Sequence, residues 1–504
     1  MKKVLIFLLV FCLYRLDAQT IDDILRVSYQ DYEGTARFAA MGGAFGALGG
    51  DISSISINPA GLAVFRKSHV SLTSSLNHIY NNSGYMGVKT GDSRLRAGIS
   101  SVGAVFNIEN QTPVKWNFGI TYMKKNNFNR RTGVKNTVND RSIIDYFSDK
   151  ANEDVNFFAP EYLDPRNAFY DYIPPDWDVV MAYDTYLIDW DADNNRYYGA
   201  LNVGDRVHQQ INSLESGSSG ELTFDLAINY SDKFYAGVML GMTTLNYRQD
   251  IIYREYALEG NTSDFDRLMY NTKLKISGLG VNCKIGIIYK PVQPVRLGLS
   301  FHSPDYFRYP YRSNDYEDYP SVMDNLYTAS MEVDYKNAGP YMSGPGEDFY
   351  LFFERIKTPY KAVGSFALVI GKLGLVSMDC EYADYSRIRL KGSAPTDRFN
   401  SDMKKYFKNT VNLRFGTELR VKNIALRAGY RHSQSPDKDY DLSRKTYSLG
   451  LGYRLKQFNI DLAYVQTNAT DHYTHYAGAN TIIENLKNRR LSLTFGWTFD
   501  SDFN

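Results

Sequence analysis

The sequence predicts an all-β fold: a 14-stranded antiparallel transmembrane β-barrel with an N-terminal segment that plugs the lumen. Three observations predict it. Short segments along the chain alternate apolar and polar residues, the connections between them alternate between long and tight, and aromatic residues make up 14% of the 504 residues, with 41 Tyr against 38 Gly. The formal net charge is only +1. This balance argues against a nucleic-acid binder, because such proteins carry a basic excess.

Residues 1–18 predict a secretory signal peptide. The chain opens with the basic Met1-Lys2-Lys3, continues with apolar and aromatic residues from Val4 to Tyr14, and reaches the small Ala18 at a plausible cleavage point, as exported proteins do. The apolar run is too short to span a membrane, because a helical span needs about 20 such residues. No other run in the chain has this character, so the sequence excludes a bundle of transmembrane helices.

From about residue 68 onward, the chain is a series of segments with two different faces. In the clearest one, Leu491, Phe495 and Trp497 share one face, whereas Ser492 and Thr494 share the other. This alternation is the signature of strands with different surroundings on their two sides. We predict fourteen strands, at roughly 68–78, 95–106, 115–126, 220–231, 233–248, 271–289, 294–303, 360–371, 373–386, 409–421, 423–434, 444–455, 457–467 and 489–499.

The connections between these strands alternate strictly in length. The longest are the loops 127–219 and 305–359. Six connections are tight, and they lie at Asn107–Val114, Ser231-Asp232, Lys290–Pro294, Lys372, Lys422 and Lys456. Tight turns on one side and long loops on the other are typical of an outer-membrane β-barrel. An even number of strands then places both chain ends on the short-turn, periplasmic side.

The two faces of the strands favour a membrane barrel over a soluble β-sandwich. A closed barrel leaves no backbone polar group unpaired in lipid. The apolar face would meet lipid, with aromatic residues near the strand ends as interfacial girdles: Trp116, Tyr122, Tyr230, Tyr289, Tyr382, Tyr430, Tyr453, Tyr464 and Trp497. The other face carries charges suited to a wet lumen: Asp225, Arg296, Asp379, Glu381, Arg414, Glu418, Arg420, Arg427, Arg431, Arg454 and Asp461. Cys283 and Cys380 fall on the outward face of non-neighbouring strands, so we expect no disulfide.

Residues 19–66 do not alternate, and we predict that they plug the lumen. The stretch 42–51 is rich in Gly and Ala, which allow close backbone approach, and we expect it to pack against the inner wall. Asn58-Pro59 marks the start of a turn, and proline suits the first position of a short helix through Ala60. The segment is too apolar for a solvated tail and too short for a domain.

The run from Gly42-Gly43-Ala44-Phe45 through Asp51 to Asn58-Pro59-Ala60-Gly61-Leu62 resembles the N-terminal hatch of the FadL/TodX (OmpP1-like) outer-membrane transport family. The likeness continues at Arg296–Pro304, Phe415–Glu418 and Leu426–Arg431, so it spans the mature chain. The resemblance implies a hatch at residues 19–66 inside a fourteen-stranded barrel at residues 67–504. It also implies passive uptake of small hydrophobic molecules such as long-chain fatty acids or aromatic hydrocarbons.

The resemblance further implies a route for the ligand. Extracellular loops capture it, a site in the lumen holds it, and hatch movement releases it through a gap made by an inward kink in the third strand. Here Gly119 is the candidate kink site, because glycine in a strand often marks a bend or bulge. The hatch and gating roles fall to Gly42, Gly43, Asp51, Asn58, Pro59 and Ala60.

The loop 127–219 is rich in aromatic residues. Tyr and Trp combine apolar area with a polar handle, which suits a binding site exposed to water. The candidate ligand-capture residues are Phe157, Phe158, Tyr170, Tyr172, Trp177 and Trp190. An equally good interpretation is that these side chains pack on each other as a lid over the barrel mouth.

Three other patterns point to chemistry more weakly. The run Asp471–Tyr476 offers His472 and His475 as haem ligands, although coincidence explains them better in a Tyr-rich chain. The stretch 189–193 is similar to the start of an EF-hand, but Ala200 stands where a bidentate Glu is needed. Ser300 and His302 share a face without a third partner for a triad. We therefore expect no metal, no cofactor and no enzymatic activity.

These observations together predict a channel in the outer membrane of a Gram-negative bacterium. The expected partners are outer-membrane lipid, a small hydrophobic ligand and the barrel-assembly machinery, with no nucleic acid, and we expect a monomer. Two alternatives stay open. One is a non-transporting relative that acts in secretion or attachment and uses its loops to dock a protein; the other is a haem-binding receptor.

Overall fold

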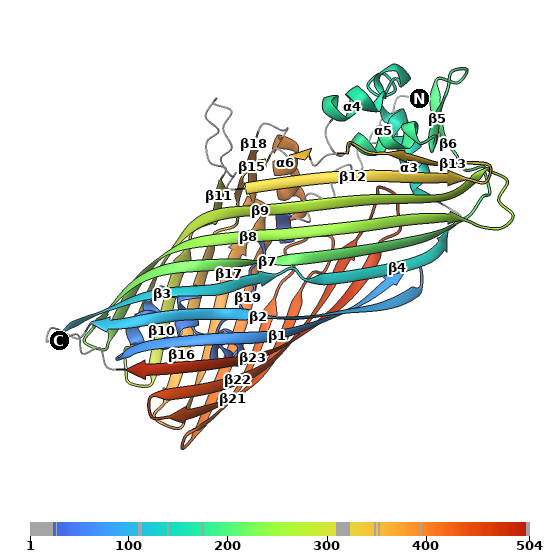
Figure 1. Ribbon diagram of the computed structural model, residues 1–504. Coiled ribbons are helices and arrows are strands. Elements are labelled where there is room, and N and C mark those ends of the chain that lie inside the picture. The colour runs from blue at the N-terminus through green and yellow to red at the C-terminus, as the bar shows by residue number, and fades with distance from the viewer. Residues whose placement is uncertain are drawn as a thin grey trace, which may run out of the picture.

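The computed structural model describes residues 24–26, 28–108, 113–138, 141–172, 176–308, 323–346, 349–350, 353–392 and 396–499. Its strands close into one antiparallel barrel, because the last strand pairs with the first from Ser68 opposite Phe499 to Gly84 opposite Ile483 (Figure 1). Neighbours around the barrel are β1 (Ser68–Tyr85), β2 (Val88–Ile108), β3 (Val114–Asn127), β7 (Val207–Tyr230), β8 (Phe234–Ala257), β9 (Phe265–Tyr289), β10 (Val295–His302), β16 (Lys361–Ile370), β17 (Gly374–Asp384), β19 (Asn409–Val421), β20 (Ile424–Ser433), β21 (Arg444–Leu455), β22 (Phe458–Tyr473) and β23 (Ile482–Phe499). The predicted fourteen-stranded antiparallel barrel is confirmed.

Short strands extend this barrel on the long-loop side. The third strand continues as β4 (Arg130–Val138) beside β7. The seventh, eighth and ninth strands continue as β11 (Tyr306–Arg308), β15 (Phe353–Lys357) and β18 (Arg389–Gly392). Strand β12 (Met323–Tyr335) pairs with the outer half of β9 and with β13 (Ala338–Ser343) and β14 (Phe349–Tyr350). The short helices η5 (Tyr385–Arg387) and α6 (Thr396–Tyr406) lie between β17 and β19 in the chain.

Several strands reach further toward the long-loop side than the alternation predicts. Strands β1 and β2 meet in a tight turn at Met86 and Gly87, where the backbone φ angles are 48° and 83°. Part of the predicted loop 127–219 is likewise strand, because β4 and the first half of β7 belong to the sheet. The reason is compositional: outer halves such as Asn81-Asn82-Ser83 are polar on both faces, so they carry no apolar–polar alternation to detect.

The two faces of the barrel differ as predicted. Leu491, Phe495 and Trp497 of β23 point outward and are about half exposed, whereas Ser492 and Thr494 point inward and are buried. Most of the predicted lumenal charges are buried inside, but Arg454 is exposed at the tight-turn end. Cys283 and Cys380 are both free. Within the described residues, no helix has the length and apolar character needed to cross a membrane.

Helices and a hairpin cover the long-loop end of the barrel (Figure 1). We call the residues 141–200 the lid; it contains α3 (Ile143–Glu153), η3 (Pro160–Tyr162), α4 (Pro165–Asp171), α5 (Trp177–Asp184), β5 (Ile188–Asp191) and β6 (Arg196–Gly199). Ser142 begins α3 with a capping box in which its hydroxyl accepts from Ile144 N. The buried lid side chains share one apolar cluster with the outer halves of β7, β8, β9 and β12.

Candidate functional site

The N-terminal segment lies in the barrel lumen. We call residues 28–65 the lumen segment; it contains α2 (Ala36–Ala40), η1 (Ile52–Ser56) and η2 (Pro59–Val64), and it is buried along most of its length. It contacts the wall on many sides: Ala36 N donates to Thr494 Oγ1 of β23 at 2.7 Å, and Ser448 Oγ of β21 donates to Ala40 O at 2.9 Å. Asp379 of β17 accepts from Gly46 N at 3.2 Å. The segment therefore contacts strands on several sides of the lumen rather than lining one side.

Asn58, Pro59 and Ala60 form the turn that the sequence predicts. Asn58 Oδ1 accepts from Ala60 N at 3.0 Å and so caps η2, while Pro59 occupies its first position. Asn58 Nδ2 donates to Gly46 O at 2.7 Å within the segment and to Ile287 O of β9 at 3.0 Å. A single buried amide thus fixes the turn and ties it to the wall.

Gly42 and Gly43 bring the segment onto the wall between β19 and β20. Their φ angles of 63° and 77° lie in the left-handed region that favours glycine. A Cβ on Gly42 would stand 3.0 Å from the carbonyl oxygens of Phe415 and Tyr430, so the close approach also requires glycine. Asp51 instead acts within the segment: it caps η1 at Ser53 N and accepts from Thr35 Oγ1, both at 2.9 Å.

Glycines of the wall match the lumen segment, and the sequence analysis did not single them out. A Cβ on Gly237 would lie 2.5 Å from Pro59, one on Gly298 2.4 Å from Gly46 O, and one on Gly429 2.2 Å from Gly42 N. These positions face inward on β8, β10 and β20. The detectable signal was a glycine on the polar face of a strand, where a small residue leaves room for a backbone on the other side.

Ion pairs add a second connection between the segment and the wall. Arg37 of α2 binds Glu418 of β19 at 3.0 Å, and Arg427 of β20 binds the same carboxylate at 2.7 Å. Arg427 also reaches Asp461 of β22 at 2.5 Å. Because each of these charges has an opposite partner, the chain of contacts is tolerated in a buried place where an unpaired charge would be costly.

The third strand separates from β2 after Met123 but stays paired with β7 through β4. Strand β2 pairs with β3 only from Ile108 opposite Trp116 to Ser101 opposite Met123. The register against β7 slips between Lys124 and Asn126. Among the described residues, no strand pairing joins the rest of β2 to β4. The wall is therefore interrupted between these two strands.

Beyond the interruption, β4 runs inside the barrel. Arg130 binds Asp471 of β22 at 2.6 Å and Glu484 of β23 at 3.1 Å. Asn81 on the inner face of β1 donates to Thr132 Oγ1 at 3.0 Å. Because these partners lie on the far side of β2, the third strand must turn inward to reach them.

The predicted kink at Gly119 is wrong in position. Gly119 pairs regularly with Val105 on one side and with Asp225 on the other. Its missing side chain serves packing instead, since a Cβ there would lie 3.1 Å from Leu62 of the lumen segment. The irregularity falls at Lys124–Asn126, which no glycine marks.

The lumen segment forms hydrogen bonds with the backbone of the third strand at the point where that strand parts from β2. Asp31 N donates to Lys125 O at 2.8 Å, and Glu33 N donates to Lys124 O at 3.0 Å. The Lys125 ammonium is buried and binds Asp305 at 2.7 Å and Glu221 at 3.3 Å. The segment and the interruption of the wall are thus physically connected.

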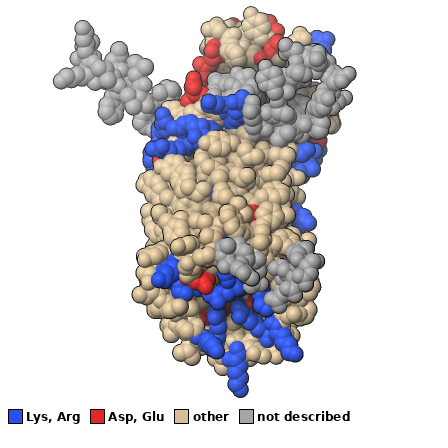
Figure 2. All heavy atoms as spheres, turned by 90° about the vertical axis from the view of Figure 1, so that its left-hand side faces the viewer, with Lys and Arg blue, Asp and Glu red and all other residues tan. Residues whose placement is uncertain are grey.

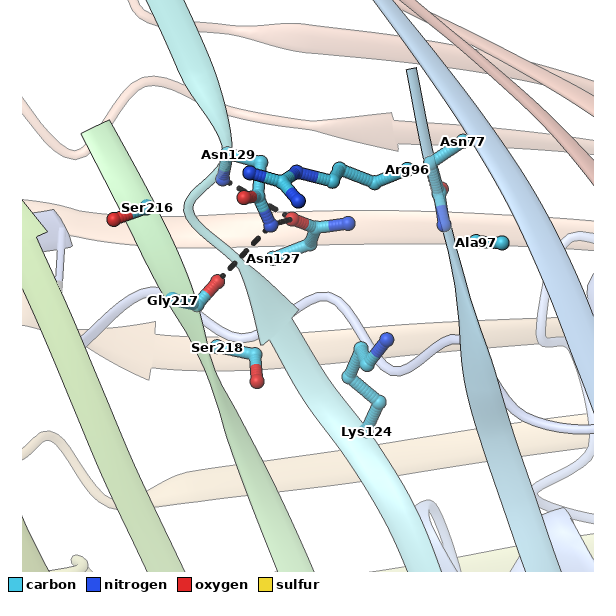
Figure 3. A pocket seen from close by; sticks show the side chains of 9 residues that line it. All are labelled: Asn77, Arg96, Ala97, Lys124, Asn127, Asn129, Ser216, Gly217 and Ser218. Atoms are coloured by element: carbon cyan, nitrogen blue, oxygen red, sulfur yellow. Dashed lines mark hydrogen bonds between the residues drawn. The ribbon is translucent and has the colours of Figure 1, made fainter. Parts of the chain in front are cut away.

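A polar cleft of about 320 Å³ opens at the interruption (Figure 3). Arg96 reaches into it from β2 and Lys124 from β3 (Figure 3). Asn129 spans its other side, where its Nδ2 donates to Gly217 O of β7 at 3.3 Å. The remaining lining residues are Asn77, Ala97, Asn127, Ser216 and Ser218. The cleft therefore presents two cations among amides and hydroxyls.

The candidate capture aromatics divide into core and surface. Phe158, Tyr172 and Trp177 are buried in the lid, and Trp177 packs edge-on against Phe169 at 5.7 Å. Trp190 is half-buried against Tyr197, with ring centroids 4.9 Å apart. Phe157 and Tyr170 are exposed, at 47% and 77%. The buried members belong to the packed core of the lid, and Phe157 and Tyr170 face solvent.

One polar cluster is built into the lid core. Lys150 Nζ of α3 binds Asp178 of α5 at 2.8 Å, and the Tyr146 hydroxyl donates to the same carboxylate at 3.1 Å. Burial and the neighbouring Asp178 carboxylate raise the pKa of Tyr146 well above its usual value, so the phenol stays protonated. The cluster joins two helices rather than serving as an acid or base.

The residues weighed for other chemistry have structural partners. Ser300 Oγ donates to Ile57 O at 2.6 Å, and His302 Nε2 lies 2.8 Å from the same oxygen. His472 stacks on Tyr440 and His475 on Tyr253, each with centroids 4.7 Å apart. The acidic stretch 189–193 belongs to the β5–β6 hairpin. In the described part of the chain, no group of three or more His, Cys, Asp or Glu is arranged to hold a metal ion.

No protein-family model matches the chain, and no curated protein matches it. Among solved structures it is similar to the P. putida toluene transporter TodX, with a TM-score of 0.53 at 11% identity over 93% of this chain and 100% of that one. It is also similar to a Pseudomonas aeruginosa FadL homologue, with a TM-score of 0.51 at 13% identity over 93% and 99%. The chain has the FadL/TodX fold. Because the FadL/TodX fold accounts for more than nine-tenths of the chain, the likeness is not confined to one stretch of barrel.

Proposed function

We propose that the chain is a Gram-negative outer-membrane channel for the passive uptake of small hydrophobic molecules. The exposed apolar outer face suits lipid, and the FadL/TodX fold supports a transport role, since one protein that shares it is described as a toluene transporter. An enzymatic role has no support from Ser300 and His302, because both side chains contact the Ile57 carbonyl.

The observation that best supports this proposal is the interruption of the wall between β2 and the third strand. A hydrophobic molecule that enters past the lid would meet the buried lumen segment, which contacts the wall on several sides, before it could follow the barrel axis. The cleft beside Arg96 and Lys124 offers a lateral way out where the ladder is broken. An exit into the membrane suits an apolar cargo, because it never has to cross an aqueous periplasmic opening.

Movement of the lumen segment would control this exit. Asp31 and Glu33 hold the backbone of Lys125 and Lys124 at the start of the interruption. Releasing these two hydrogen bonds would free the third strand where it borders the cleft. The segment would therefore act as a hatch whose displacement and the opening of the wall occur together.

The charges of the cleft favour a fatty-acid-like cargo over an aromatic hydrocarbon. Arg96 and Lys124 line the cleft, no acidic side chain is among its lining residues, and the nearest carboxylate to Lys124 Nζ is that of the buried Glu33, at 4.0 Å. Charge-assisted hydrogen bonds from such cations stabilise a carboxylate, whereas a hydrocarbon gains nothing from them. We therefore propose a long-chain carboxylic acid as the substrate class.

A matched pair of substitutions on β2 tests the exit route. Ala97 lines the cleft from the outward face of β2, opposite the exposed Leu76, whereas Ala104 lies on the same face where β2 is paired with β3, opposite the exposed Val70 and Ile120. Ala97→Trp should obstruct the cleft at its outer edge and slow the uptake of radiolabelled fatty acid by cells that make the protein. Ala104→Trp should leave the uptake rate unchanged. Equal rates for the two variants would sink the lateral route.

A further inference from the structure

Basic side chains gather at the tight-turn end of the barrel. Figure 2 views the molecule from the side where the C-terminus and several of these turns lie in Figure 1, and Lys and Arg side chains cluster in its lower part. They come from successive turns and strand ends around the barrel: Lys233, Lys290, Lys372, Lys422, Arg454 and Lys456. We call these six residues the basic rim.

Few acids accompany the basic rim. Among the described residues at this end, Asp232 is the solvent-facing carboxylate, and Arg66 already lies 3.4 Å from it. The other acids of the inner half, such as Glu418 and Asp461, are buried and paired in the lumen. The described residues of the tight-turn end therefore carry a net positive charge, although the whole chain is nearly neutral.

Hydrogen bonds between neighbouring turns bring these cations into one arc. Lys290 N donates to Lys233 O at 2.8 Å, which joins the β7–β8 turn to the β9–β10 turn. Arg454 N donates to Asn423 O at 3.0 Å, which joins the β19–β20 turn to the end of β21. Val369 N donates to Pro294 O at 2.7 Å and Arg420 N donates to Leu373 O at 2.8 Å, so the intervening turns are joined as well and the rim follows one arc.

Two of the rim lysines stand where local backbone geometry disfavours them. Lys422 and Lys456 have φ angles of 54° and 41°. Two-residue hairpin turns with positive φ prefer Asn, Asp or Gly, because a larger side chain crowds the backbone there. Lysine at both positions keeps a cation at the rim at the expense of turn stability.

Exposed aromatic residues lie next to the rim on the strand ends. Tyr289 precedes Lys290, Tyr453 precedes Arg454 and Phe458 follows Lys456 closely, and all three are 43–55% exposed. Phe458 stacks on Trp497 with centroids 6.2 Å apart. Aromatic belts of this kind sit at the level of lipid headgroups, so the adjoining cations lie at headgroup depth.

We propose that the basic rim binds the phosphate groups of anionic phospholipids in the inner leaflet of the outer membrane. This rests on the membrane placement proposed above. Cations beside an aromatic belt match a phosphate that sits just outside the acyl region. A bound ring of lipid would hold the tight-turn end at a fixed depth and fix the height at which the wall interruption meets the bilayer.

Native mass spectrometry of the full-length protein in detergent tests the proposal. Phosphatidylglycerol, phosphatidylcholine and soluble glycerol phosphate are added separately at equal concentrations. The rim variant is Lys290→Gln/Lys372→Gln/Lys422→Asn/Lys456→Asn, in which the two Asn replacements suit the positive φ angles. The charge-matched control, Lys89→Gln/Lys404→Gln/Lys405→Gln/Lys408→Gln, removes lysines from the opposite, long-loop end.

The wild type and the control should both retain phosphatidylglycerol in preference to phosphatidylcholine. The rim variant should lose that preference by roughly tenfold or more, because each basic residue near an anionic surface contributes about fivefold. Equal retention of the two lipids by the wild type, an unchanged preference in the rim variant, or equal binding of glycerol phosphate would each overturn the proposal. Fatty-acid uptake measured on the same variants is a separate readout, so a channel that fails to transport can be told apart from a rim that fails to bind lipid.

Discussion

Asn58 joins three parts of the molecule through one side chain. Its oxygen caps η2, and its nitrogen binds Gly46 O within the lumen segment and Ile287 O in the wall. Gly286 makes this possible, because a Cβ there would stand 2.0 Å from Asn58 Oδ1. At the residue scale the sequence predicted the turn, since Asn-Pro is a local signal. The wall contact depends on residues more than 200 positions away and leaves no local signal.

Two substitutions at Asn58 separate its roles. Asn58→Ala should remove the cap, which contributes about 1 kcal/mol, and both amide contacts. Asn58→Ser should keep the cap acceptor and lose only the contacts to Gly46 and Ile287. Hydrogen exchange of residues 46–64 should therefore rise most in the alanine variant and to an intermediate level in the serine variant. Unchanged exchange in both variants would show that Asn58 does not hold the segment.

Arg96 and Lys124 should discriminate between cargoes. Arg96→Gln/Lys124→Gln keeps hydrogen-bond donors in the cleft but removes both charges. Uptake of a long-chain fatty acid should fall several-fold, because the carboxylate loses its charged partners, while uptake of toluene should not change. Measuring both rates on one variant makes the toluene rate the internal control. A parallel fall in both rates would contradict a charge-selective cleft.

At the element scale, the strands near the membrane were predictable and their outer halves were not. Strand β19 was predicted at residues 409–421 and runs over Asn409–Val421, because lipid on one face and polar lumen on the other impose strict alternation. Strand β9 was predicted from residue 271 and begins at Phe265. Above the apolar band both faces meet polar surroundings, so the pattern that identifies a strand disappears.

The third strand shows the same limit more sharply. A glycine was the only kink signal that its sequence offers, yet Gly119 is regular and the break lies at Lys124–Asn126. The cause is tertiary, because the backbone amides of Asp31 and Glu33 donate hydrogen bonds to the carbonyl oxygens of Lys125 and Lys124. A break created by a competing segment distant in sequence cannot be read from the strand itself.

Substitution of a buried aromatic residue of the lid should affect stability, whereas substitution of an exposed one should affect uptake. Trp177 is 1% exposed and donates from Nε1 to Tyr172 O at 3.2 Å, whereas Tyr170 is 77% exposed. Trp177→Ala should destabilise the lid by about 3–5 kcal/mol, visible as faster proteolysis of residues 141–200. Tyr170→Ala should change the stability by less than about 0.5 kcal/mol but lower fatty-acid uptake if it captures ligand. Equal proteolysis of both variants would contradict the division into core and surface.

At the scale of the whole molecule, the proposed path joins the lid, the lumen segment and the wall interruption. The lid covers the long-loop end, the lumen segment lies buried in the lumen, and the interruption beside β2 is the exit that we propose. Paired charges, matched glycines and two apolar clusters, one around Phe38 and Phe45 and one around Ile55 and Leu62, hold the lumen segment against the wall.

The most direct test of the lateral path is photocrosslinking with a fatty acid that carries a diazirine near its carboxylate. Cells that make the full-length protein take up the probe, are irradiated, and the labelled peptides are identified by mass spectrometry. The account predicts labels around Ala97, Lys124 and Ser218, and their loss in the Ala97→Trp variant. Labels confined to the inner faces of β19–β21, with none at the cleft, would contradict it.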